Sequence, residues 1–315
     1  MMKKVFRAVL FLAVFALLFQ LITPLFVPKN NAKYMGIHED EAKGFLGEAP
    51  DSIDVLFLGD SEVFSTFVPL QIWRDYGITS YLCSTGDQVV YQSYAYLKRM
   101  FQYHSPKIVV FEANALYRDF GLAEMVSYEL EEVFPYLRYH DRWKSLNSED
   151  WGGKVEFSNL IRDKGYTYRT RAIPADDAGY MTPAEESYPI SQLNIWYFEK
   201  IRTFCEEQGA QLVVVSAPST TNWDYYHHNG VEQLLMGSNI PYVDMNLMQE
   251  QIPINWQTDS YDGGDHLNYA GAVKVTDYMG RLLWDTGLFA DKRQEAAYAT
   301  WNAALEELQA VVASE

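Results

Sequence analysis

Short hydrophobic runs recur along the chain and predict the strands of a single sheet. Each run is aliphatic or aromatic and ends at a turn, which is typical of a strand buried on both faces. The runs cover residues 53–58, 79–83, 107–112, 211–218 and 240–245. This pattern predicts five strands with helices on both sides of the sheet.

The segments between these runs carry apolar residues at helical spacing. Helices are expected at residues 69–76, 89–104, 190–209, 231–236 and 269–283. Strands that alternate with helices through right-handed crossovers form a parallel sheet. The sequence therefore predicts an α/β fold with a doubly wound, five-stranded parallel sheet.

A long apolar stretch precedes the first strand. Residues 8–27 are almost wholly apolar, and about twenty helical residues are long enough to cross a bilayer. Lys3, Lys4 and Arg7 come before this stretch, and no small-x-small cleavage pattern follows it. We therefore expect an uncleaved membrane anchor rather than a cleaved signal peptide. The cations place the N-terminus in the cytoplasm and the rest of the chain outside.

These features predict how the chain is divided. Residues 1–28 are expected to form a cytoplasmic stub and transmembrane anchor, and the polar residues 29–52 a tether. The α/β domain is expected over residues 53–286, with an insertion at about 115–189 that shows no clear periodicity. Long insertions often form lids or binding elements, so we expect this one to lie across the upper edge of the sheet. Residues 287–315 are expected to form a terminal amphipathic helix.

Composition narrows the function classes. The formal charge is −17 over 315 residues, which argues against nucleic-acid binding because the phosphate backbone is also negative. Aromatic residues make up 15% of the chain and are expected mostly in the core. Cys83 and Cys205 are expected to be separate buried thiols. A disulfide between them is the alternative if the domain lies outside the cytoplasm.

A serine follows the first strand. In Gly59-Asp60-Ser61 the glycine permits a tight turn, and Ser61 then lies at the carboxyl edge of the sheet, where open α/β folds bind ligands. The alternative is that Asp60 and Ser61 only cap the next helix. A nucleophilic serine needs a base, and the base needs a group that orients it.

His266 is the candidate base, because it follows the fifth strand and precedes a helix, which places it at the same edge. Asp262 could fold back over two glycines and hold the imidazole Nδ1–H, leaving Nε2 to face Ser61. Asp265 stays open as the alternative orienting residue. The other interpretation is that Asp265 and Asn268 are helix caps and His266 has no catalytic role.

No metal site or cofactor is expected. His227 and His228 are adjacent, and no third ligand at useful spacing accompanies them. Trp223, Tyr225 and Tyr226 stand close by in the sequence. This group is expected to line a groove or a surface.

The placement of Gly59-Asp60-Ser61 and of the Asp/His cluster resembles the SGNH/GDSL hydrolase superfamily. The closest resemblance is to the membrane-anchored envelope branch that includes DltD and the alginate O-acetylation proteins. It covers about residues 50–115 and 190–285 and leaves out the insertion. It implies a flavodoxin-like SGNH fold in which Ser61 is the nucleophile that accepts the acyl group.

The resemblance also implies an oxyanion hole completed by Gly86 after the second strand and Asn114 after the third. The residues around Asn114 depart from the family, because Glu112 and Ala115 stand where glycine and aspartate are usual. The family also places its aspartate three residues before the histidine, where this chain has Gly263.

The sequence therefore predicts a serine-dependent esterase or O-acyltransferase outside the cytoplasmic membrane. The expected substrate is an acyl ester or a cell-envelope glycan or polymer, and a membrane acyl-donor protein is a possible partner. Hydrolysis and transfer share an acyl-enzyme, so the motifs leave water and a glycan hydroxyl open as the acceptor. The alternative class is a non-catalytic envelope scaffold or glycan-binding module that keeps the fold.

Overall fold

The computed structural model describes residues 2–314, which form two compact units. The anchor unit comprises the chain up to residue 40 together with residues 120–159. The sheet unit comprises residues 41–119 and the chain from residue 160 onward.

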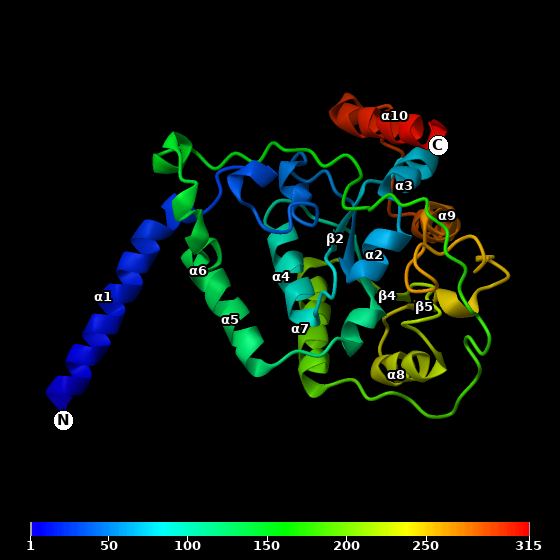
Figure 1. Ribbon diagram of the computed structural model, residues 1–315, viewed down its shortest axis with the longest axis horizontal. Coiled ribbons are helices and arrows are strands. Elements are labelled where there is room, and N and C mark those ends of the chain that lie inside the picture. The colour runs from blue at the N-terminus through cyan, green and yellow to red at the C-terminus, as the bar shows by residue number, and fades with distance from the viewer. Residues whose placement is uncertain (1, 315) are drawn as a thin grey trace. The chain divides into compact units, whose positions relative to one another are not determined.

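The sheet unit is built on five parallel strands (Figure 1). They are β1 (Val55–Gly59), β2 (Ser80–Ser84), β3 (Ile108–Glu112), β4 (Gln211–Ser216) and β5 (Tyr242–Asp244), in the order β2-β1-β3-β4-β5. In the inner strand β1, Phe57 is paired with Leu82 on one side and Val110 on the other. Every residue of β1, β2 and β3 is buried, which explains why these strands read as continuous apolar runs. The predicted parallel sheet is confirmed, and its order is the flavodoxin-like one.

Helices cover both faces of this sheet. On one face α4 (Val90–Met100) packs against α7 (Gln192–Gln208), with Tyr94 and Phe204 in edge-on contact. A second group of helices packs together through α3, which contacts both α9 and α10. This group consists of α2 (Ser61–Thr66), α3 (Pro69–Tyr76), α9 (Tyr269–Asp285) and α10 (Ala299–Ala313). The doubly wound arrangement places the ends of β1 and β3 next to one another at the carboxyl edge.

The helix after β4 begins earlier than the sequence predicts. We expected a helix at residues 231–236, but α8 runs from Tyr225 to Leu235. Asp224 caps it, because its carboxylate accepts a hydrogen bond from the His227 N–H. His227 and His228 therefore lie on a helix rather than in a loop.

Part of the expected tether is folded into the sheet unit. Phe45 is fully buried, and its carbonyl is 2.9 Å from His104 Nε2. Glu48 forms a buried ion pair with Lys164, with 2.7 Å between Oε1 and Nζ. The Lys164 ammonium also lies over the Trp301 ring of α10. The sequence of residues 29–52 does not predict this packing, because its longest run of buried large apolar residues is the pair Phe45-Leu46.

The expected insertion at 115–189 is not one element. Residues 120–159 belong to the anchor unit, whereas the chain from residue 160 returns to the sheet unit. In the sheet unit the returning segment is extended and hydrogen-bonded to distant backbone: Thr167 donates to the Phe64 carbonyl, and Ile173 donates to the Ser260 carbonyl. This correction assigns the two halves of the insertion to different parts of the fold.

In the anchor unit, α1 (Met2–Phe26) is long and apolar enough to span a membrane or to serve as a signal sequence. It is followed in the same unit by α5 (Leu122–Val133) and α6 (Pro135–Tyr139). Both cysteines lie in the sheet unit, where they are free and buried, as the sequence predicts.

Candidate active site

The turn after β1 places Ser61 at the start of a helix. A Cβ on Gly59 would lie 2.6 Å from Val63 Cγ2 and 2.7 Å from Glu112 Cβ, so only glycine fits between α2 and β3. Asp60 is fully buried and caps α2, with Oδ1 accepting a 3.1 Å hydrogen bond from the Glu62 N–H. Ser61 is the first residue of α2 and is itself buried. The helix-cap interpretation of Asp60 is therefore correct, and it leaves the Ser61 side chain at the carboxyl edge.

Asp262 holds His266 in place. Its Oδ2 lies 2.7 Å from His266 Nδ1, and its Oδ1 accepts a 2.8 Å hydrogen bond from the His266 backbone N–H. Gly263 and Gly264 have φ values of 86° and 107°, which let the loop fold back. Asp265 Oδ2 is 3.6 Å from the same nitrogen, beyond hydrogen-bond range. Of the two aspartates left open by the sequence, Asp262 makes the hydrogen bond.

His266 lies against the first turn of α2. Its ring is stacked on the Phe64 ring, with 6.5 Å between the centroids. The His266 Nε2 atom is buried and has no hydrogen-bond partner among residues 2–314. Ser61 and His266 are thus brought to the same edge of the sheet, without a hydrogen bond between them. Catalytic hydrogen bonds often form only when substrate is bound.

Asn222 links the histidine loop to α2. Its Nδ2 donates a 2.9 Å hydrogen bond to Glu62 Oε1 and a second bond to Asp265 Oδ1. Glu62, Asp265 and His266 each place one potential metal ligand within 4.8 Å of the other two, which the sequence analysis does not anticipate. Hydrogen bonds from the Asn222 amide to both carboxyl groups explain why Glu62 and Asp265 lie close together.

Of the two expected oxyanion-hole residues, Asn114 lies beside the Gly59-Asp60-Ser61 turn. Its Nδ2 donates a 3.0 Å hydrogen bond to Asp60 Oδ2, and its backbone N–H donates to Glu112 Oε2. Gly86 lies exposed in the loop after β2, and a Cβ there would meet nothing within 4 Å. Its neighbour Asp87 pairs with Arg118, which in turn binds Asp60. These contacts connect the Gly86 loop to the Gly59-Asp60-Ser61 turn.

Arg118 binds Asp60 at this edge, a contact that the sequence does not predict. Its Nε and Nη2 both lie 2.7 Å from Asp60 Oδ2, and its Nη1 lies 3.1 Å from Asp87 Oδ1. Arg118 follows Asn114 by one helical turn in the sequence, the only signal that it shares this edge. It lay in a stretch interpreted as an irregular insertion.

The carboxyl groups of Asp60, Glu62 and Glu112 are buried together around the Gly59-Asp60-Ser61 turn. Burial raises the pKa of the Glu62 carboxyl well above its usual range, and the charges of Asp60 and Glu112 raise it further. Burial likewise raises the pKa of Glu112, with Asp60 adding to the effect. Burial also raises the pKa of Asp60, although the Arg118 charge opposes this. Glu62 Oε2 has no hydrogen-bond partner among the described residues, so a neutral Glu62 carries the smaller desolvation cost.

The histidine pair on α8 is engaged in hydrogen bonds. His228 Nδ1 lies 2.8 Å from Asp244 Oδ2, which also accepts a 3.0 Å hydrogen bond from the Trp223 indole. His227 Nδ1 lies 2.7 Å from Asp224 Oδ1, and its ring is stacked on Trp223. These hydrogen bonds and ring contacts give the aromatic and histidine residues of this cluster a structural role.

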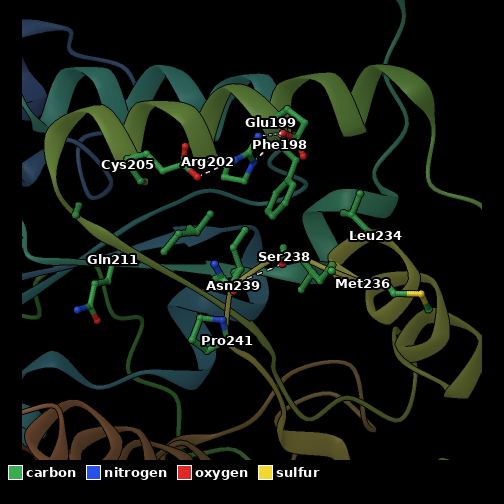
Figure 2. Close-up of a pocket in the computed structure, with 16 residues that line it drawn as sticks. Phe198, Glu199, Arg202, Cys205, Gln211, Leu234, Met236, Ser238, Asn239 and Pro241 are labelled. Atoms are coloured by element: carbon green, nitrogen blue, oxygen red, sulfur yellow. Dashed lines mark hydrogen bonds and ion pairs between the residues drawn. The ribbon is translucent and has the colours of Figure 1, made fainter.

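A cavity of about 660 Å³ lies between α7 and the loop that leads to β5 (Figure 2). It borders Gln211, the first residue of β4, so it lies at the opposite end of the strands from Ser61. Arg202 lines it and is neutralised by Glu199 and Glu206. The cavity is therefore separate from the candidate active site.

No protein-family model and no curated protein matches the chain. A protein from Bacteroides fragilis described as an acylhydrolase is similar in structure, with 11% identity and a TM-score of 0.40 over 79% of this chain and 95% of that chain. A GDSL-like lipase from Bacteroides thetaiotaomicron aligns with 11% identity and a TM-score of 0.36 over 75% of this chain and 87% of its own. A lipase/acylhydrolase from Enterococcus faecalis aligns with 12% identity and a TM-score of 0.36 over 74% and 96%.

Proposed function

We propose that this protein is a serine-dependent acyl-ester hydrolase or O-acyltransferase. One observation carries the proposal: the Asp262–His266 pair lies against the turn of α2 that begins with Ser61, and His266 Nε2 has no hydrogen-bond partner among residues 2–314. A hydrogen bond from Nδ1–H to a carboxylate fixes the tautomer in which Nε2 can accept a proton.

In the proposed reaction, Ser61 Oγ attacks the acyl carbonyl and its proton passes to His266 Nε2. The carbonyl π electrons move to oxygen, which forms a tetrahedral oxyanion. When this collapses, the ester C–O bond breaks and the leaving alkoxide takes the proton from Nε2. Water or a sugar hydroxyl then attacks the acyl-enzyme and gives its proton to His266 Nε2. The bond between the acyl carbon and Ser61 Oγ breaks, and Nε2 returns the proton to Ser61 Oγ. Asp262 stabilises the imidazolium that forms in both halves.

The oxyanion is proposed to bind the backbone N–H groups of Ser61 and Gly86. Asn114 uses one of its two amide hydrogens on Asp60, so the other is free to serve as a third donor. A well-placed donor of this kind contributes about 3–4 kcal/mol to the transition state. Arg118 is proposed to hold Asp60 and the Gly86 loop at the correct spacing.

The proposed location is the outer face of the cytoplasmic membrane. The apolar helix α1, with cations only at its start, supports a cytoplasmic N-terminus and an external sheet unit. The proposed substrates are therefore acyl esters of cell-envelope glycans or polymers. A membrane protein that supplies acyl groups is the proposed partner for the transfer reaction.

The first test is covalent labelling of the full chain in detergent with a fluorescent fluorophosphonate. Labelling is expected at Ser61 and should be absent in Ser61→Ala and strongly reduced in His266→Ala. Ser105→Ala, at an exposed serine, is the matched control and should label normally. A folded wild-type protein that stays unlabelled would support the non-catalytic scaffold instead.

The second test separates hydrolysis from transfer. The full chain is given an isotopically labelled acetyl ester with and without oligosaccharide acceptors, and the label is followed by mass spectrometry. Label on the sugar identifies a transferase, and label in free acetate alone identifies an esterase. Product that forms equally well with Ser61→Ala would contradict the proposed acyl-enzyme.

A further inference from the structure

Helix α5 in the anchor unit is amphipathic with its apolar face outward. None of its residues is buried, and its aliphatic side chains are between 45% and 61% exposed. These side chains are Leu122, Val126, Leu130 and Val133. At about 100° per residue they fall within an arc of about 80°, so they form one stripe along the helix.

The opposite face of α5 is polar and is held by α6. The Arg138 guanidinium lies over the Tyr128 ring and pairs with Glu131 and Glu132. Water-soluble helices are arranged in the reverse way, with their aliphatic residues inside. The stripe therefore requires an apolar environment on its outer side.

Contacts with the outer end of α1 indicate how deep this stripe would lie in a bilayer. The Gln20 side chain donates a 2.9 Å hydrogen bond to the Val133 carbonyl, and the Tyr136 ring contacts both Phe19 and Phe26. Gln20 lies about 9 Å along the helix axis before Phe26, the last residue of α1. If α1 spans the bilayer, the end of α5 lies within the outer leaflet.

Two exposed tryptophans occur in the same part of the unit. Trp143 and Trp151 are both more than half exposed, and Trp151 borders the same hollow as Leu21, Ile22 and Lys29. Tryptophan is enriched where a membrane helix leaves the hydrocarbon region. Their position beside the last turns of α1 marks the same level as the Gln20–Val133 contact.

We propose that residues 120–159 form a membrane-seated collar around the outer end of α1, with the α5 stripe inserted among the acyl chains of the outer leaflet. The occupant of the stripe is lipid, because the carbonyl of Val133, the last residue of the stripe, is hydrogen-bonded to Gln20 of α1, and the apolar side chains of α1 are themselves exposed. The collar gives the protein a second attachment to the bilayer besides the span. This inference rests on the proposed anchor and is independent of the proposed chemistry.

The test uses the full chain with one environment-sensitive fluorophore at an introduced cysteine. The protein is reconstituted in phosphatidylcholine/phosphatidylglycerol vesicles, with brominated acyl chains as the quencher. Native Cys83 and Cys205 are buried and give little background. Val126→Cys reports the stripe, Ser127→Cys reports the adjacent face of the same helix, and Met236→Cys reports the sheet unit.

The Val126 probe is expected to emit at shorter wavelength and to lose roughly half of its emission to the brominated lipid, as a buried interfacial residue would. The Ser127 probe should be quenched less, and the Met236 probe should match the unquenched value. A Val126 probe that behaves like the Met236 probe would overturn the collar, and would assign the stripe to a protein partner. Leu10→Cys reports the span alone, so its quenching separates failure of the collar from failure of the anchor.

Discussion

Replacing Asp262 with asparagine tests the part of the site that the geometry defines best. In Asp262→Asn the side chain keeps its shape, but its NH₂ group can donate to His266 Nδ1. This favours the tautomer with hydrogen on Nε2, which cannot accept the Ser61 proton. The backbone N–H of His266 would keep its acceptor, so the loop should retain its fold.

The magnitude follows from the 2.7 Å contact between Nδ1 and the carboxylate. A hydrogen bond to a charged group contributes about 1.5–3 kcal/mol, and each 1.36 kcal/mol is tenfold in rate, so its loss alone costs about 10- to 150-fold. Reversal of the tautomer adds to this, up to about 10⁴ for fully buried triads. Because the Asp262 side chain is 31% exposed, water replaces part of the lost interaction, and we expect a decrease of about 10²–10³.

The assay is the second-order rate constant for fluorophosphonate labelling of the full chain, which requires no knowledge of the natural substrate. Asp265→Asn is the matched control, because Asp265 is 3.6 Å from the same nitrogen and should lower the rate by less than about fivefold. If Asp265→Asn lowers the rate as much as Asp262→Asn, or if Asp262→Asn labels like the wild type, the assignment of Asp262 as the orienting residue is wrong.

Three further predictions concern stability. Because the folded-state pKa of Glu62 is raised above its unfolded value, its contribution to stability is present at low pH and is lost as pH rises through the folded pKa. Glu62→Gln should therefore raise Tm more at pH 8 than at pH 5, whereas exposed Glu306→Gln should change it equally at both; a uniform change for Glu62→Gln would contradict the buried acid. Lys164→Met leaves Glu48 buried without its partner and should cost about 3–5 kcal/mol in urea unfolding, with most of the loss recovered when Glu48→Leu is added; a loss below 1 kcal/mol would mean that water reaches the pair. Gly59→Ala places a Cβ against two side chains and should cost at least about 1–3 kcal/mol in the same measurement, so an unchanged denaturation midpoint would refute the close approach.

The sheet could be predicted because the burial of each strand is visible in its own residues. Residues of β1 and β3 are covered on both faces, so each strand appears as an unbroken apolar run. The helix α8 was partly missed because its first turn holds Tyr225, Tyr226, His227 and His228, which have no helical period of their own. Its start is set by the Asp224 cap, a contact that depends on the fold of the loop.

The site could be predicted where sequence neighbours also meet in space. Asp262 and His266 are close along the chain, and two glycines between them indicate the fold-back that joins them. Arg118 and Asn222 contact segments that are far away in the sequence, and no local pattern predicts these contacts. The folded part of the expected tether was missed for the same reason, since Phe45 and Glu48 are buried by distant partners.

The chain passes between the two units at three points, near residues 40, 119 and 160, and these enter the sheet unit at two different places. The crossings near residues 40 and 160 both lead to the Glu48–Lys164 pair, so these two covalent routes enter the sheet unit beside one buried ion pair. The crossing near residue 119 comes directly after Arg118, whose guanidinium holds the aspartate that precedes Ser61. Of the three covalent connections to the anchor unit, the one near residue 119 is therefore the one that leads directly to the aspartate before Ser61.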